Sequence, residues 1–114
     1  MSHDRRKEIG VSRLVNLVVY RVKKGKDEEF KKLLAQHWPT LNKAGLVKPE
    51  PAKIWRGVNI RSDHQGSSWI EMFSWKTEDA GDIAHQMPEV MKIWEPMTPI
   101  LDGMDIYYME PEQL

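Results

Sequence analysis

The stretch FSWKTEDAGDIAHQMPEV, residues 73–90, contains the passage from a strand into a helix. Its first residues close the segment SWIEMFSWK, residues 68–76, whose aromatic and apolar content is typical of a strand. Thr77 can cap a following helix, and Glu78 and Asp79 suit a first turn, where the helix dipole is positive. The stretch therefore predicts a strand that leads directly into a helix.

Pro88 interrupts this helix. A proline inside a helix causes a kink, whereas a proline suits the first position of a new helix. We therefore expect the first piece to end near Gln86 and a second piece to follow, ending at Pro96 and Pro99. The second piece should pack on a sheet through its apolar residues, which are Val90, Met91, Ile93 and Trp94.

Two strands and an amphipathic helix are expected upstream. LVNLVVYRVK, residues 14–23, is rich in β-branched residues and predicts a strand. AKIWRGVNI, residues 52–60, predicts a second strand with a candidate bulge at Gly57, and this strand forms a hairpin with the next. Between them a helix is expected to kink at Pro39 and end at Gly45. Its core-facing side follows helical spacing and comprises Phe30, Leu33, Leu34, His37, Trp38 and Leu41.

The last predicted strand is MDIYYME, residues 104–110, after a turn at Asp102 and Gly103. The element order is therefore β-α-β-β-α-β. This order predicts an α+β fold, in which a four-stranded antiparallel sheet carries both helices on one face in the ferredoxin-like arrangement. We expect a single domain, residues 13–114, preceded by a flexible N-terminal arm, residues 1–12.

Both faces of the predicted sheet carry large apolar side chains. In the first strand Val18 and Tyr20 point one way, and Leu17 and Val19 point the other. A sheet with one face in water alternates apolar and polar residues instead. A second apolar face needs a cover, and the few residues after the last strand cannot supply it. We therefore expect a homodimer packed through this sheet face, which makes a dimeric α–β barrel.

The composition excludes several classes of function. Seventeen basic residues balance seventeen acidic ones, which gives no electrostatic reason to bind nucleic acid or an anionic membrane. No cysteine is present, and the four histidines are scattered without an H-x-x-x-H spacing or a neighbouring set of carboxylates, so no metal site is expected. No apolar run is long enough to span a membrane. We expect a cytoplasmic protein.

The sequence resembles the dimeric α–β barrel superfamily and, within it, the antibiotic-biosynthesis-monooxygenase-like proteins. The resemblance runs from Leu14 to Glu110 and rests on the element order, the stretch 73–90 and the late segment DIYYME. In that family the third strand ends in an aromatic residue, followed by a polar turn, a helix with a histidine, and a break. Trp75 and the segment HQMP that begins at His85 look like this pattern. The superfamily also includes heme-binding proteins and dehalogenating or isomerising enzymes, so the pattern is typical of a fold more than of one activity.

The resemblance implies a small monooxygenase that needs no metal, flavin or other cofactor. The substrate supplies the electrons, and the protein holds an aromatic or polyketide-like molecule, stabilises its anion and accepts a proton. We expect a pocket between helices and sheet, with His85 as the catalytic base. The residues expected to bind the small hydrophobic or aromatic ligand are Asn16, Tyr20, His37, Trp75 and Trp94.

Each candidate also has a purely structural interpretation. His85 can be a solvent-facing helix end, and Asn16, an amide within an apolar strand, either lines a pocket or pairs with a loop. For the whole protein, the alternative is a non-catalytic ligand-binding or structural dimer of the same fold. Heme binding is disfavoured, because the heme-degrading branch has its iron ligand, a histidine, at or near the position that Trp94 occupies here.

Overall fold

A computed structural model describes residues 11–114, and most of the expected N-terminal arm, residues 1–10, lies outside the described residues. The elements follow the predicted order β-α-β-β-α-β, with the second helical region in two pieces. Their bounds are β1 (Val15–Val22), α2 (Asp27–Lys43), β2 (Lys53–Gly57), β3 (Ser68–Ser74), α3 (Ala80–Ala84), α4 (Pro88–Met97), the 3-10 turn η1 (Thr98–Ile100) and β4 (Leu101–Met109).

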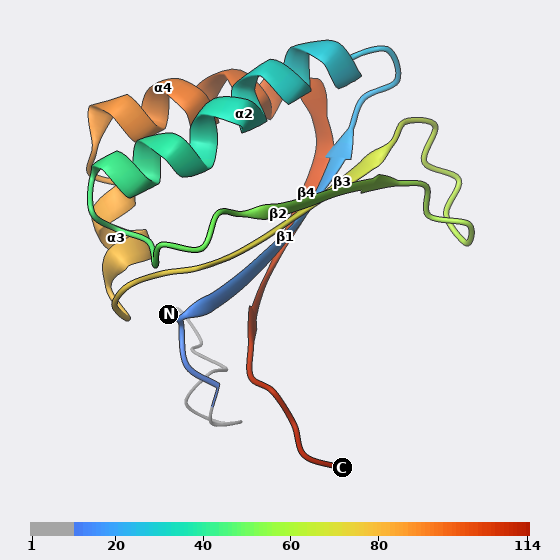
Figure 1. Ribbon diagram of the computed structural model, residues 1–114. Helices are drawn as coiled ribbons and strands as arrows, with labels where there is room; N and C mark the ends of the chain where they lie inside the picture. The colour runs from blue at the N-terminus through green and yellow to red at the C-terminus, as the bar shows by residue number, and fades with distance from the viewer. Residues whose placement is uncertain (1–10) are drawn as a thin grey trace, which may run out of the picture.

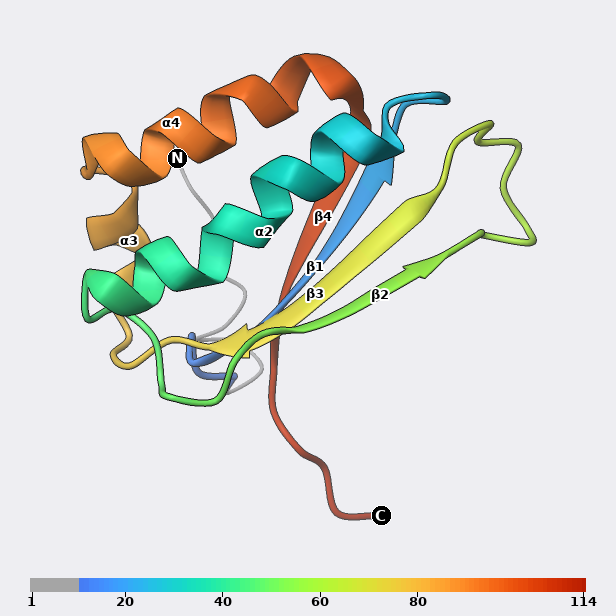
Figure 2. The ribbon, with the colours of Figure 1, turned by 45° about the horizontal axis from the view of Figure 1, so that its top comes forward.

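The four strands form one antiparallel sheet in the order β2-β3-β1-β4. Figure 1 shows α2 and α4 above one face of this sheet, with α3 at its edge. Figure 2, viewed from the helical side, shows α2 and α4 lying next to each other across the strands. The ferredoxin-like α+β fold predicted from the sequence is therefore confirmed.

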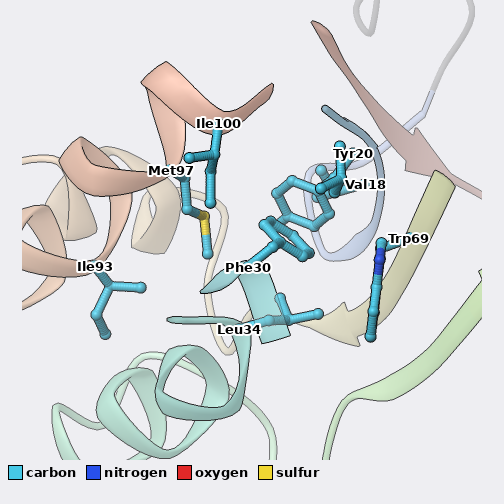
Figure 3. Packing of buried hydrophobic residues seen from close by; sticks show 9 residues of the cluster. Val18, Tyr20, Phe30, Leu34, Trp69, Ile93, Met97 and Ile100 are labelled. Carbon is cyan, nitrogen blue, oxygen red and sulfur yellow. The ribbon is translucent and has the colours of Figure 1, made fainter. Parts of the chain in front are cut away.

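Strand β1 divides its side chains between the two faces of the sheet. Asn16, Val18, Tyr20 and Val22 are buried beneath the helices, as the period of two requires. The core on this face contains aromatic residues in contact. The ring centroids of Phe30 and Tyr20 lie 4.9 Å apart. Figure 3 shows Phe30 between Tyr20, Leu34 and Trp69, with Met97 and Ile100 approaching from the end of α4.

The opposite face of the sheet carries no helix (Figure 1). Large apolar side chains nonetheless project from it. Trp55 and Tyr107 are about half exposed, at 50% and 52%. The registers of the strands place further apolar residues on this outer face, and these are Val15, Leu17, Val19, Ile70, Met72 and Met109. The sheet is thus apolar on both sides, as the sequence predicts.

Helix α2 ends where Gly45 was expected to stop it. Gly45 has a φ of +75°, a left-handed conformation that glycine adopts without strain. Its backbone N–H donates to the carbonyl of Asn42, and that of Leu46 donates to the carbonyl of Leu41. This pair of bonds is a Schellman motif, which satisfies carbonyls at the helix end.

Two predicted details are wrong, the turn before the last strand and the bulge at Gly57. Strand β4 begins at Leu101, so Asp102 and Gly103 belong to the strand and form no turn. Gly103 pairs with Arg21, whose guanidinium lies where a side chain at position 103 would stand, and this pairing prevails over the local turn preference. Gly57 pairs regularly with Ser68, and the bulge lies instead in β4, where Asp102 is the extra residue opposite the step from Arg21 to Val22.

The helix ends fall where the prolines and Gly45 led us to expect them. Helix α2 runs through Pro39 to Lys43, just before Gly45, and α4 ends at Met97, between Pro96 and Pro99. A proline removes only one helical donor, and tertiary packing of the apolar face holds the rest of each helix. Pro88 stands at the first turn of α4, as predicted.

Candidate functional site

A cavity of about 280 Å³ lies between the sheet and helix α4. A cavity of roughly 150 Å³ can hold benzene, so this one has room for a ligand of about two rings. The structure brings all six residues predicted for the site to its wall, and these are Asn16, Tyr20, His37, Trp75, His85 and Trp94. Their roles toward a ligand remain predictions.

The floor of the cavity is a ladder of residue pairs across β1 and β4. Asn16 faces Tyr108 on the first rung, Val18 faces Ile106 on the second, and Tyr20 faces Met104 on the third. Since side chains on one face of a strand recur every second residue, these pairs point to the same side. The cavity therefore extends along the strands from Asn16 toward Tyr20.

Asn16 is the buried polar residue that meets the cavity most directly. Its side chain is only 4% exposed, and no described residue forms a hydrogen bond with its amide. A buried amide without a protein partner has strong hydrogen-bonding capacity left for water or a ligand. Asn16 can therefore donate to one oxygen of a ligand and accept from another group.

His85 stands at the C-terminal end of α3, on the exposed side of the cavity. Its Nδ1 lies 2.8 Å from the carbonyl oxygen of Gly81. A carbonyl can only accept, so Nδ1 carries the proton, and Nε2 of the neutral ring keeps its lone pair. The imidazole also lies against the indole of Trp94, with ring centroids 4.6 Å apart.

A buried hydrogen-bond network runs from the sheet to α4 behind the cavity wall. Glu71 of β3 is fully buried, and its carboxylate oxygens lie 2.9 and 3.0 Å from Nδ1 of His37. The Tyr20 hydroxyl donates to the same carboxylate at 2.8 Å. The Trp94 indole N–H lies 2.8 Å from Nε2 of His37.

This network fixes the protonation of His37. The indole N–H of Trp94 can only donate, so Nε2 of His37 must accept and Nδ1 must donate to Glu71. His37 is therefore neutral, and neither of its ring nitrogens is available to a ligand. Burial raises the pKa of Tyr20 well above its usual value of 10.0, and the Glu71 charge raises it further.

Sequence reasoning missed Glu71, although one signal was present. A glutamate stands inside the apolar segment SWIEMFSWK, on the face that carries Trp69 and Phe73. A carboxylate on a core-facing strand position needs hydrogen-bond donors around it. That rule predicts a buried partner set for Glu71, but only the fold identifies its members.

Arg13 is the second missed residue, and it closes one end of the cavity. Its guanidinium donates to both carboxylate oxygens of Asp82 on α3, at 2.9 and 3.1 Å, and to the Tyr108 hydroxyl at 3.1 Å. Hydrogen bonding to Asp82, and then to Tyr108, raises the pKa of Arg13 above its usual value. Arg13 thus ties the start of β1 to α3 and β4 beside His85.

The remaining polar atom of note in the cavity wall is the indole nitrogen of Trp75, which is buried without a partner. It lies beneath Gly81, where a Cβ atom would still be at ordinary contact distance from the indole. Within residues 11–114, no group of three or more His, Cys, Asp or Glu side chains could hold a metal ion. No helix in the same part of the chain is long and apolar enough to cross a membrane.

The fold and the site define a small α+β protein with a cavity between a helical layer and an antiparallel sheet. No protein-family model matches the sequence. No curated protein matches it either. Solved structures do, and among those whose fold this chain shares are an antibiotic biosynthesis monooxygenase and a cofactor-independent oxygenase.

Three solved structures illustrate this similarity. The Arabidopsis thaliana protein At3g17210 shares 17% identity with a TM-score of 0.68, over 89% of this chain and 97% of its own. An antibiotic biosynthesis monooxygenase shares 10% identity with a TM-score of 0.66, over 88% and 99%. SnoaB, a cofactor-independent oxygenase from Streptomyces nogalater, shares 14% identity with a TM-score of 0.62, over 90% and 97%. At these identities the similarity establishes the fold alone.

Proposed function

We propose that the protein is a small cofactor-independent monooxygenase-like enzyme that acts on an electron-rich aromatic or polyketide-like molecule in the cavity. One observation carries the proposal. The hydrogen bond from Nδ1 of His85 to the Gly81 carbonyl makes Nε2 the ring nitrogen that can act as a base, at a cavity that is mainly apolar and aromatic. The shared fold with a cofactor-independent oxygenase supports it.

In this mechanism His85 accepts the proton of a phenolic hydroxyl. Asn16 donates its amide N–H to the resulting oxyanion, which a mostly apolar cavity would otherwise leave without stabilisation. Arg13 at the same end is ion-paired with Asp82, so it fixes the Tyr108 hydroxyl in place and adds little net potential for an anion. The aromatic side chains of the wall, Trp94 among them, position the substrate ring beside His85.

The electron-rich anion then reacts with dioxygen. One oxygen atom forms a new C–O bond at the ring carbon para to the phenol oxygen, and the second leaves as water with the two hydrogens that the substrate loses. A naphthol and dioxygen thereby give a naphthoquinone and water, so that all atoms balance. Dioxygen is reduced by four electrons, and all four come from the substrate.

Oxygen uptake with a naphthol tests the proposal. Because general-base catalysis contributes about 10²–10⁴-fold, His85→Ala should lower the rate by that factor while circular dichroism shows an intact fold. The matched control is His64→Ala, since His64 lies outside the cavity. An equal rate in His85→Ala and the unaltered protein would remove His85 from the mechanism. Ligand binding without oxygen uptake would favour the non-catalytic alternative.

We also infer that the apolar outer face of the sheet, opposite the helices, packs against the same face of a second copy. The partly exposed side chains of Trp55 and Tyr107, which flank Ile70 and Leu17, support a homodimer through this face. A cytoplasmic location remains a prediction from the sequence.

A further inference from the structure

Hydrogen-bonding capacity is distributed unevenly along the cavity wall. Three side chains of the wall, those of Tyr20, His37 and Trp94, direct their polar atoms away from the cavity and into the network behind it. The Tyr20 hydroxyl is bonded to Glu71, and the Trp94 indole N–H is bonded to His37. Both nitrogens of His37 are engaged as well. These three side chains therefore present carbon surface to the cavity.

The Tyr20 end of the cavity is mostly apolar. Its third rung is Tyr20 facing Met104, and the second rung is Val18 facing Ile106. Met97 and Leu101 line it from the end of α4 and the start of β4, and the exposed Thr98 between them is the polar residue of this part of the lining. A polar ligand atom placed between the second and third rungs would lose its water without gaining a partner, which costs about 1–3 kcal/mol or more.

The first rung has the opposite character. Asn16 is buried and its amide forms no hydrogen bond within residues 11–114, and Nε2 of His85 has no hydrogen bond to a described residue. The buried Trp75 indole N–H, also without a partner, belongs to the same part of the wall. Donors and acceptors that await a ligand are thus gathered at one end of the cavity.

We propose that the cavity binds an amphipathic molecule in one orientation: a hydroxyl-bearing ring against Asn16 and His85, and an unbranched hydrocarbon tail along β1 toward Tyr20 and Met104. The first and third rungs are four residues apart, or roughly 13 Å along a strand, which leaves room for a tail beyond a single ring. This inference rests on the proposed function only in that the cavity is the ligand site.

Glu71 contributes to the preference for a hydrocarbon tail at the Tyr20 end of the cavity. Without its carboxylate, the Tyr20 hydroxyl and the Nδ1–H of His37 would need other acceptors, and the cavity is the nearest open space. Glu71 touches no ligand, because it is fully buried behind the wall. By accepting hydrogen bonds from Tyr20 and His37, Glu71 therefore keeps the cavity wall around the hydrocarbon tail apolar.

Binding of para-alkylphenols from ethyl to octyl, followed by tryptophan fluorescence, tests the proposal. Each added CH₂ should lower Kd by about fourfold at most, the value for full transfer from water, until the tail end is filled. Each alkylphenol should also bind about tenfold more tightly than the alkylbenzene of the same length. A Kd that does not change with chain length, or equal binding of the alkylbenzenes, would overturn the proposal, as would failure of the whole series to bind.

Two variants locate the ends of the ligand. Asn16→Leu should abolish the preference for the phenol while leaving the dependence on chain length, and Asn42→Leu, at an exposed asparagine of α2, is the matched control. Met104→Trp should weaken the long-chain members more than the short ones. Unchanged preferences in both folded variants would contradict the orientation. Should either fail to fold, the ligand series with the unaltered protein decides alone.

The outcome is separable from that of the proposed enzyme. Chain-length-dependent binding without oxygen uptake would uphold the ligand class and contradict the monooxygenase. Oxygen uptake with naphthol, together with binding that does not depend on chain length, would uphold the monooxygenase and contradict the ligand class.

Discussion

At the scale of single residues, the most consequential side chain is the buried Glu71. A carboxylate removed from water is costly unless donors surround it, and here a phenol and an imidazole N–H supply them. The same bonds set the tautomer of His37 and, through it, the direction of the Trp94 indole. One residue therefore connects β1, α2, β3 and α4.

Glu71→Leu should destabilise the fold by about 2–4 kcal/mol. The change leaves the Tyr20 hydroxyl and the His37 Nδ1–H without an acceptor, and each unpaired buried group costs about 1–3 kcal/mol. Part of that loss is offset because the carboxylate is no longer buried. Urea unfolding measures the difference in free energy.

Two further variants control this measurement. Glu71→Gln keeps one acceptor for His37 and one donor for Tyr20, so its loss should be clearly smaller. Glu50→Leu makes the same substitution at an exposed loop position and should change stability by less than about 0.5 kcal/mol. Equal losses in the Leu and Gln variants at position 71 would show that the network contributes little.

At the scale of elements, the break between α3 and α4 is the feature that prepares the site. Met87 is extended and Pro88 opens α4, so α3 ends at Ala84, with His85 as its C-terminal cap residue. The Gly81 carbonyl accepts a long bond of 3.3 Å from the His85 backbone N–H, and its second lone pair accepts from the His85 ring. The helix end therefore determines which nitrogen of His85 can act as a base.

Helix α2 offers a test of how local and tertiary forces are balanced in this fold. Pro39 is exposed within the helix and cannot donate to the carbonyl of Ala35. Pro39→Ala should therefore stabilise the protein, by up to about 3 kcal/mol, with the midpoint of thermal unfolding as the measurement. Pro88→Ala is the matched control and should have little effect, since a proline in the first turn loses no helical bond. A lower midpoint for Pro39→Ala would mean that α2 depends on the geometry that the proline imposes.

At the scale of the whole molecule, the sheet divides its apolar side chains between two faces, and the helices cover one of them. The outer face, opposite the helices, is continuous over all four strands, and Leu17 lies near its centre on β1. Exposing an apolar sheet face of this extent to water is unfavourable, because the free energy cost grows with the exposed apolar area. Association of two such faces removes it from solvent.

Light scattering should therefore give a mass of twice 13.4 kDa. Leu17→Lys places a charge in the centre of the outer face and should shift the mass to that of one chain. Ile83→Lys, at a partly exposed position on α3, is the control and should leave the mass unchanged. A single-chain mass for the unaltered protein would contradict the dimer.

The amino-acid sequence by itself determined the order of the elements, the two apolar faces of the sheet, the glycine stop of α2 and the break before α4. These features depend on side-chain period and on backbone preferences of a few neighbouring residues, which the sequence displays directly. It also pointed to six residues of the cavity wall, with the family resemblance as a guide.

Only the tertiary structure decided how those residues are connected. Glu71 and His37 are 34 positions apart, His37 and Trp94 are 57 apart, and Arg13 and Asp82 are 69 apart. Strand register and helix packing bring such partners together, and no local pattern encodes the hydrogen bonds that result. For the same reason the sequence, which assigned Tyr20, His37 and Trp94 to ligand binding, did not show that the folded chain directs their polar atoms away from the cavity.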